Sequence, residues 1–245
     1  MELDVKNEPE DTEQIKYGLA LHTTTPELGL AMSRLTGDTR CGVWNLERNL
    51  SSQIHQYLVE FIHPQTWADL AFISVAKGPG GFTGSRIGVV TARTLGQQLN
   101  IPVFAISTLA AVAWDHLPSK SVVPYGKPFG FTVAYTGKPA SSTASPFRVY
   151  AVEMPAQRGQ VFAAIYQPLP NASGLNVLLP DSVFTQEAWQ EKLANWKTSY
   201  QLIEAKSGLA ATVTSVLDLA YLEWQQGKRP DWSEALPFYG QHPVE

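Results

Sequence analysis

Apolar and polar positions follow different periods along the first part of the chain, and the change of period predicts its elements. Short apolar runs at residues 17–25, 28–35 and 41–48 are separated by tight turns, which is typical of an antiparallel meander of strands. Between residues 50 and 63 apolar side chains instead recur every three or four positions, which predicts a helix. This part of the chain therefore indicates a strand meander followed by a helix.

The next stretch alternates between the same two kinds of element. Residues 68–76 and 101–107 are apolar without alternation, as buried strands are, and residues 85–100 and 108–117 have helical spacing. The order of three strands, helix, strand, helix, strand and helix fits a mixed sheet with right-handed parallel crossovers. It is the order of one half of the actin-like, ribonuclease-H-like fold.

The second half opens with a boundary, because residues 118–147 are rich in Pro, Gly, Ser and Thr. Strands are predicted at 148–154, 160–167, 176–184 and 200–205, with helices at 185–196 and 207–227. We expect an α/β protein of actin-like fold, whose two subdomains each hold a mixed sheet and flanking helices. The expected units are a disordered lead-in at 1–16, a first subdomain at 17–113 plus about 206–228, a second subdomain at 114–205, and a tail at 229–245.

The amino-acid composition of the chain limits the kinds of partner and the cellular location that we expect. The chain has 245 residues, of which 44% are apolar, and its formal net charge is -4. Because phosphate neutralisation needs clustered Lys and Arg, the chain alone is not expected to bind nucleic acid strongly. Its single cysteine, Cys41, excludes an internal disulfide, and no apolar run approaches the roughly 18 residues of a membrane span. We therefore expect a cytoplasmic protein with no membrane contact.

The segment KGPGGFTGSRIG, residues 77–88, joins a predicted strand to a predicted helix and raises the question of a phosphate site. The Walker A pattern needs Lys and then Ser or Thr after its last glycine, whereas Gly84 is followed by Ser85 and Arg86. A dinucleotide loop needs a carboxylate about 20 residues further on for the ribose, and Asn100 lies near that position. We therefore favour a loop whose glycines shape the strand–helix corner, with direct anion or nucleotide contact as the alternative. The candidate contacts for that alternative are Lys77, Gly78, Gly80, Gly81, Ser85 and Arg86.

The helix predicted after this loop has two rows of apolar or small residues on different faces. Gly88, Ala92 and Gly96 fall four residues apart on one face, where small side chains let another element approach closely. A second stripe, which includes Ile87 and Val90, could pack on the protein's own sheet. We expect one stripe to meet the core and the other, the small row, to meet a partner. Packing of the small row on the protein's own sheet is the alternative.

The polar residues of the sequence do not form a recognisable catalytic site. His55 and His63 are eight residues apart, so they do not form the pair four apart on one helix face that binds a metal. Thr83 and Ser85 lack an evident His–Asp pair that could activate either hydroxyl. The charge of Arg86 opposes the dipole at the start of its helix, so we expect a carboxylate or another anion as its partner.

A long and specific motif points to a known family. Residues 78–109, GPGGFTGSRIGVVTARTLGQQLNIPVFAISTL, closely resemble the signature of the TsaB family, in which a run like GPGSFTGVRIG leads into a helix and then a strand ending in Ser-Thr-Leu or Ser-Ser-Leu. Weaker similarity extends over nearly the whole chain. Residues 19–32 resemble the family's first hairpin, residues 156–167 its Asp-Ala-Arg-Arg-x-Glu-Val-Tyr strand, and residues 235–240 its C-terminal Pro-x-Tyr-Leu-Arg.

The resemblance implies an actin-like subunit of the machinery that makes threonylcarbamoyladenosine beside the tRNA anticodon. It implies a non-catalytic platform for the relative TsaD, which carries the active site and metal, and it implies TsaE as an ATPase that joins them. A homodimer is expected when the chain is alone, with tRNA contact only through the complex. No tightly bound cofactor is expected, and ATP or ADP at the partner interface is left open. Docking would use the first two helices, with Ile54, Tyr57, Leu58, Phe61, Gly88, Thr91, Ala92, Leu95 and Gly96 as candidate contacts.

The chain departs from the family pattern at several positions. His22 stands where the first strand usually ends in an Asp that would organise magnesium and phosphate, and Pro155 replaces the Asp of the second-subdomain motif. Ser51 replaces a His that often opens the first helix, and the stretch 118–147 is longer than usual. Arg158 matches a residue of a cleft strand and is a further candidate for anion contact. These departures argue against an actin-like ATPase or small-molecule kinase, and the missing metal-ligand pair argues against a metallo-glycopeptidase. Both classes are kept as alternatives.

Overall fold

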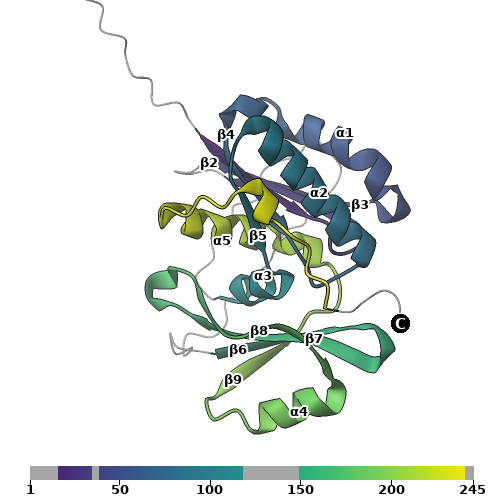
Figure 1. The fold of residues 1–245 in the computed structure, drawn as a ribbon, viewed down its shortest axis with the longest axis vertical. Coiled ribbons are helices and arrows are strands. Elements are labelled where there is room, and N and C mark those ends of the chain that lie inside the picture. Colours follow the sequence, from purple (N-terminus) through teal and green to yellow (C-terminus); the bar gives the residue numbers. More distant parts are fainter. Residues whose placement is uncertain (1–15, 35–38, 118–148, 241–245) are drawn as a thin grey trace, which may run out of the picture.

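The computed structural model describes residues 16–34, 39–117 and 149–240, and it contains two stacked β-sheets with helices between and outside them (Figure 1). Nearly all of the predicted lead-in and the whole predicted 118–147 insertion lie outside the described residues. The α/β class with two mixed sheets and flanking helices is confirmed.

The first sheet has five strands in the order β3-β2-β1-β4-β5. They are β1 Tyr17–His22, β2 Glu27–Arg34, β3 Thr39–Asn45, β4 Leu70–Ala76 and β5 Val103–Ile106. The first three form the predicted antiparallel meander, β4 runs parallel to β1, and β5 runs parallel to β4. β4 is buried along its whole length, because helices cover both faces of the sheet.

Helices on opposite faces of this sheet form two core clusters. α1 (Leu50–Ile62) and α2 (Phe82–Leu99) pack with Leu19 and Leu21 of β1, whereas α5 (Val213–Gln225) packs on the other face with Ala20. The last helix is shorter than the predicted 207–227. Gly208 has the left-handed φ of +69°, and Leu209–Thr212 form a 3-10 turn before α5 begins.

The second sheet has four strands in the order β8-β7-β6-β9. They are β6 Val149–Pro155, β7 Gln160–Pro168, β8 Leu175–Thr185 and β9 Tyr200–Glu204. β9 runs parallel to β6 after the crossover helix α4 (Gln186–Ala194), and the other two pairings are antiparallel. Trp189 of α4 is fully buried against the outer face of this sheet.

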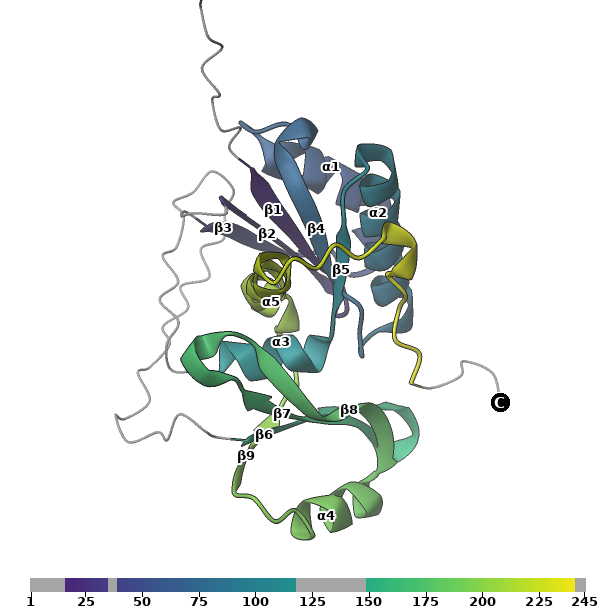
Figure 2. The same cartoon turned by 60° about the vertical axis from the view of Figure 1, so that its left-hand side comes forward.

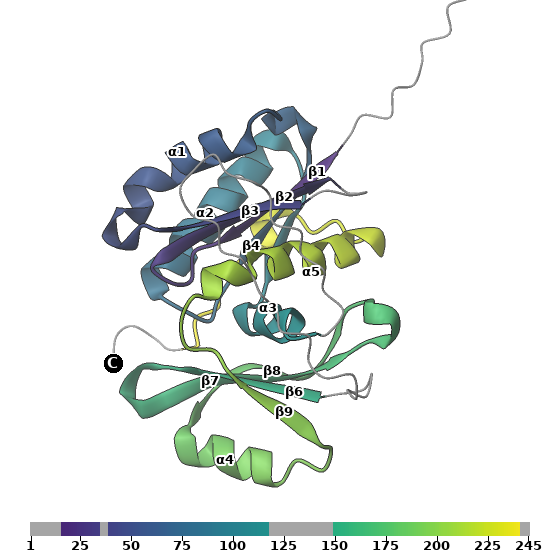
Figure 3. The same cartoon turned by 180° about the vertical axis from the view of Figure 1, so that it is seen from behind.

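One short helix joins the two halves. α3 (Thr108–Asp115) contributes Leu109 and Val112 to the cluster beneath the second sheet, and its Trp114 indole donates to Asp218 of α5 at 3.2 Å. The layers therefore run from α1 and α2 through the first sheet, α5, α3 and the second sheet to α4 (Figures 2 and 3).

Residues 230–240, here called the C-terminal strap, run back across the molecule beside α2 (Figure 1). The strap begins beside β5, where Val103 N–H donates to Pro230 O at 3.4 Å. It ends where Phe238 N–H donates to Lys77 O at 2.8 Å, and the Phe238 ring lies 6.2 Å from that of Phe162 in the second sheet. The strap thus contacts both sheets, although it was expected as a tail. The expected subdomain boundaries stay a prediction.

Candidate functional site

The glycine loop forms a tight corner between β4 and α2. Gly78 has a φ of +107°, which side chains rarely adopt. A Cβ on Gly80 would lie 2.5 Å from Thr24 Cβ, so only glycine permits this approach to the turn after β1. Gly81 N–H donates to Thr24 O at 2.7 Å, and the amide and hydroxyl of Ser85 both donate to Gly81 O at 2.9 Å. Because these donors are already bonded within the protein, the geometry favours the structural interpretation of the loop.

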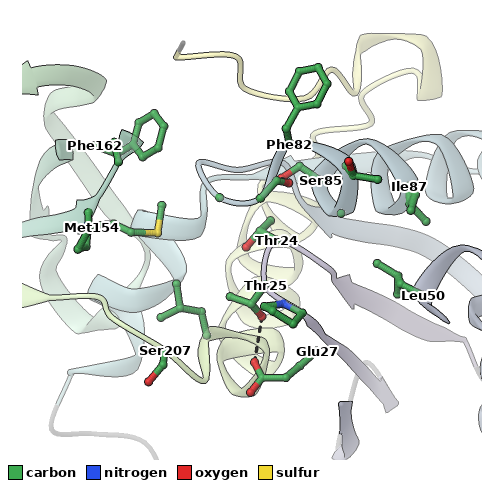
Figure 4. A pocket seen from close by; sticks show the side chains of 18 of the residues that line it. Thr24, Thr25, Glu27, Leu50, Phe82, Ser85, Ile87, Met154, Phe162 and Ser207 are labelled. Carbon is green, nitrogen blue, oxygen red and sulfur yellow. Dashed lines mark hydrogen bonds between the residues drawn. The ribbon is translucent and has the colours of Figure 1, made fainter. Parts of the chain in front are cut away.

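A cleft of about 1420 Å³ opens between the two sheets. Figure 4 shows Met154 and Phe162 of the second sheet on one side, and Thr24 of the turn after β1 and Phe82 at the start of α2 on the other. Of the candidate anion contacts, Gly80, Gly81 and Ser85 line this cleft. The others do not line it: Lys77, Gly78, Arg86 and Arg158.

The cleft's charged residues do not gather into a metal site. Thr25 donates to Glu27 at 3.0 Å, and Lys206 pairs with Glu204 at 2.8 Å. Within the described ranges no group of three or more His, Cys, Asp or Glu side chains lies close enough to hold a metal ion.

His22 occupies the end of β1 as predicted, but it is sealed away from the cleft. Its side chain is 0% exposed, and neither ring nitrogen has a hydrogen-bond partner among the described residues. Burial lowers the pKa of His22 to about 3, because the charged form cannot be hydrated there. At neutral pH His22 is therefore a neutral core residue and a poor magnesium ligand.

A second hollow, of about 440 Å³, is an apolar groove between α1 and α2. We call it the helix groove. Val59 of α1 and Val90 of α2 line it, and they are 50% and 59% exposed. Ile54, Leu58, Thr91 and Leu95, all candidate contacts from the sequence, line it as well. Its remaining lining residues are Ser51, His55, Trp67, Arg86, Ile87 and Thr94.

The two stripes of α2 face the opposite way from our expectation. Ala92 is fully buried, a Cβ on Gly88 would collide with Thr23, and one on Gly96 would collide with Val103. The small row therefore lets α2 lie close to its own sheet, and its assignment to an outward face is wrong. The stripe with Ile87 and Val90 lines the groove instead.

Two further candidates on α1 also lie away from the groove. Tyr57 and Phe61 pack against Trp44 of β3, with ring centroids 5.0 and 6.0 Å apart. Sequence reasoning missed Val59, and it assigned Val90 to the core. The signal available for Val59 was an apolar side chain outside the buried stripe of Ile54 and Leu58.

Arg86 was expected to meet a carboxylate or another anion, and within the described part of the chain it meets aromatic rings instead. Its guanidinium carbon lies 4.2 Å from the ring centroid of Phe82 and 5.2 Å from that of Tyr239 in the strap. Its Nε donates to the Tyr239 hydroxyl at 2.9 Å. Arg158 lies in an exposed turn with a φ of +58°. Contact of either arginine with an anion stays a prediction.

Comparisons with known proteins find similarity to two kinds of protein, TsaD and TsaB, whose names refer to threonylcarbamoyladenosine in tRNA. The family model described as "TsaD: tRNA N6-adenosine threonylcarbamoyltransferase" matches residues 46–126. The chain is 31% identical over 180 residues to the "tRNA threonylcarbamoyladenosine biosynthesis protein TsaB" of Bacillus subtilis, covering 71% of this chain and 65% of that relative. It is 41% identical over 61 residues to the TsaB of Buchnera aphidicola subsp. Schizaphis graminum, covering 24% of this chain and 29% of that relative. The matches thus span less than two thirds of either relative.

A solved structure from Pseudomonas aeruginosa, described as an uncharacterized protein with similarity to peptidase YEAZ, shares the fold. Its TM-score is 0.67 at 19% identity, and the match covers 93% of this chain and all of that one. At this identity the likeness shows the fold alone. The identity to named TsaB proteins and the glycine-loop signature make the chain similar to the TsaB family over most of its length.

Proposed function

We propose that the chain is a non-catalytic subunit for tRNA threonylcarbamoyladenosine synthesis and that the helix groove docks its TsaD homologue. This proposal rests mainly on the exposed apolar side chains of the helix groove. It exposes Val59 and Val90 side by side on two helices whose other faces are packed on the sheet. Burying two such half-exposed side chains contributes on the order of 1 kcal/mol each, so a partner that covers them gains affinity.

The kind of partner follows from the segment that forms the groove. The TsaD family model matches residues 46–126, which include α1, the glycine loop and α2. A TsaD homologue therefore carries a segment similar to the one that lines this groove. Two similar helix pairs can meet face to face in a four-helix contact. The same geometry supports a homodimer of this chain when the TsaD homologue is absent.

The non-catalytic role is supported by the cleft between the sheets. An actin-like ATPase or kinase needs a carboxylate that holds magnesium at the end of β1, and the buried, neutral His22 stands there. A metallo-glycopeptidase needs clustered metal ligands, and the described residues offer none. None of the helices in the described ranges is long and apolar enough to span a bilayer. The proposal has four further parts. TsaE takes part in the complex, and the chain contacts tRNA only through that complex. ATP or ADP binds at the partner interface, and the protein is located in the cytoplasm.

Reconstitution with purified components tests this function. The TsaD and TsaE homologues of the same genome, a source of the threonylcarbamoyl group, and tRNA are combined with and without this chain. We expect threonylcarbamoyladenosine in the tRNA only when the chain is present, and ATP hydrolysis by the chain alone at the background rate. Full modification without the chain would contradict its role as a required subunit. ATP turnover by the chain alone at about 1 per second, within the usual enzyme range, would contradict the non-catalytic assignment.

A further inference from the structure

Arg86 is held in place at the junction of the helix groove and the C-terminal strap. It lines the groove, its Nε donates to Tyr239 of the strap, and its guanidinium stacks on Phe82. In the described part of the chain neither terminal nitrogen has a hydrogen-bond or ion-pair partner. An arginine ordered by aromatic rings loses little freedom when it forms a further hydrogen bond.

Its surroundings suit a protein carboxylate. Arg86 is the one Lys or Arg among the groove-lining residues, and Val90 stands one helical turn away on the exposed side of α2. A nucleic-acid phosphate surface needs several clustered cations, which this groove lacks. Arginine and aromatic side chains beside an apolar patch are instead typical of the residues that dominate protein–protein affinity.

We infer that Arg86 pairs with a carboxylate of the TsaD homologue at the end of the helix groove, and that Tyr239 of the strap is its positioning residue. The inference rests on the proposed function, since it needs that partner to occupy the groove. It adds the strap, which lies more than a hundred residues from the groove in sequence, to the docking surface. The carboxylate accepts two parallel hydrogen bonds from the terminal nitrogens of Arg86, and no proton is transferred.

The test is the dissociation constant of the purified TsaD homologue, measured by titration calorimetry at low and at high salt. Arg86→Gln removes the charge and should weaken binding about 10- to 30-fold at low salt and flatten the salt dependence. Arg86→Lys keeps the charge but loses the fork, so it should retain the salt dependence with an intermediate affinity. Arg229→Gln is the matched control, because Arg229 also stacks on an aromatic ring, that of Trp224, and does not line the groove.

Variants of Tyr239 distinguish the positioning of Arg86 by the Tyr239 hydroxyl from the packing of the Tyr239 ring. Tyr239→Phe keeps the ring and loses the hydrogen bond to Arg86, so binding should weaken about threefold with the wild-type salt dependence. Tyr239→Ala should weaken it further, while a thermal melt shows whether the strap still folds. Unchanged affinity and unchanged salt dependence in Arg86→Gln would overturn this inference alone. Failure of the wild-type chain to bind the TsaD homologue would overturn the proposed function and this inference with it.

Discussion

At the residue scale, His22 places a buried, neutral side chain at the end of β1, where the resemblance to the TsaB family implies an Asp. A carboxylate at the end of β1 would carry its charge into the protein, whereas imidazole can be buried there as a neutral group. Burial of a neutral histidine makes the stability of the folded chain depend on pH. The unfolded chain takes up a proton near pH 6.5, and the native chain resists it until about pH 3. The unfolded state thus binds more protons in that window, so stability falls as pH falls through it.

His22→Leu should remove this sensitivity. Between pH 6.5 and pH 5.5 the free energy of unfolding of the wild type should fall by about 1 kcal/mol more than that of the variant. Urea denaturation at the two pH values measures the difference. His55→Gln, at an exposed position of α1, is the control and should keep the wild-type slope. Equal slopes in His22→Leu and wild type would show that His22 is not kept neutral by burial.

At the scale of the element, α2 illustrates what its sequence could and could not predict. The helix was predicted at 85–100 and runs from Phe82 to Leu99, so it begins within the glycine loop, three residues before the predicted start. Which stripe faces the sheet could not be predicted. Small residues permit close approach equally to a strand of the same chain and to a helix of another, and only the packed structure shows Thr23 and Val103 against them. The stacking of Arg86 on Tyr239 had no local signal, since the two residues are far apart in sequence.

Tryptophan substitutions on the two stripes test this orientation. Ala92 is 0% exposed, so Ala92→Trp has no room for its indole and should lower the melting temperature by at least 10 °C or prevent folding. Val90→Trp lies on the exposed stripe of the same helix and should melt within a few degrees of the wild type. Thermal denaturation followed by circular dichroism compares the two. Similar melting of both variants would mean that the small row is not packed on the sheet.

At the scale of the whole molecule, contacts distant in sequence hold the two sheets together. Ser107, before α3, and Tyr166 of β7 both donate to Asp181 of β8 at 2.8 Å. Burial raises the pKa of Asp181 and that of Tyr166, and the two hydrogen bonds to Asp181 oppose the shift of its carboxyl. The sheets were predicted from local patterns, but this link and the strap were not. Neither the Ser107–Asp181 link nor the strap is marked by a periodic pattern of apolar residues in the sequence. Both depend on how the two halves of the molecule are placed relative to each other.

Tyr166→Phe tests the link between the sheets. The variant keeps the buried ring and removes two contacts of the hydroxyl: its hydrogen bond to Asp181 within the second sheet, and its 3.2 Å hydrogen bond with Ser107, which follows β5 of the first sheet. The free energy of unfolding should therefore fall by about 1–2 kcal/mol. Tyr200→Phe, at a more exposed tyrosine of β9, should change it by less than about 0.5 kcal/mol. Denaturant titration at pH 7 gives both values. A Tyr166→Phe variant as stable as the wild type would show that the Tyr166 hydroxyl, with its contact to Ser107, does not contribute to holding the sheets together.

The most direct measurement of the central claim is the affinity of this chain for its TsaD homologue when the helix groove carries a charge. Val90→Asp and Val177→Asp place the same carboxylate at positions 59% and 53% exposed, the first in the groove and the second on β8. Calorimetric titration should show binding at least tenfold weaker for Val90→Asp and wild-type affinity for Val177→Asp, because only the first places a charge in the apolar groove, one helical turn from Arg86, where it competes for the guanidinium. Equal affinities for wild type, Val90→Asp and Val177→Asp would contradict docking through the groove.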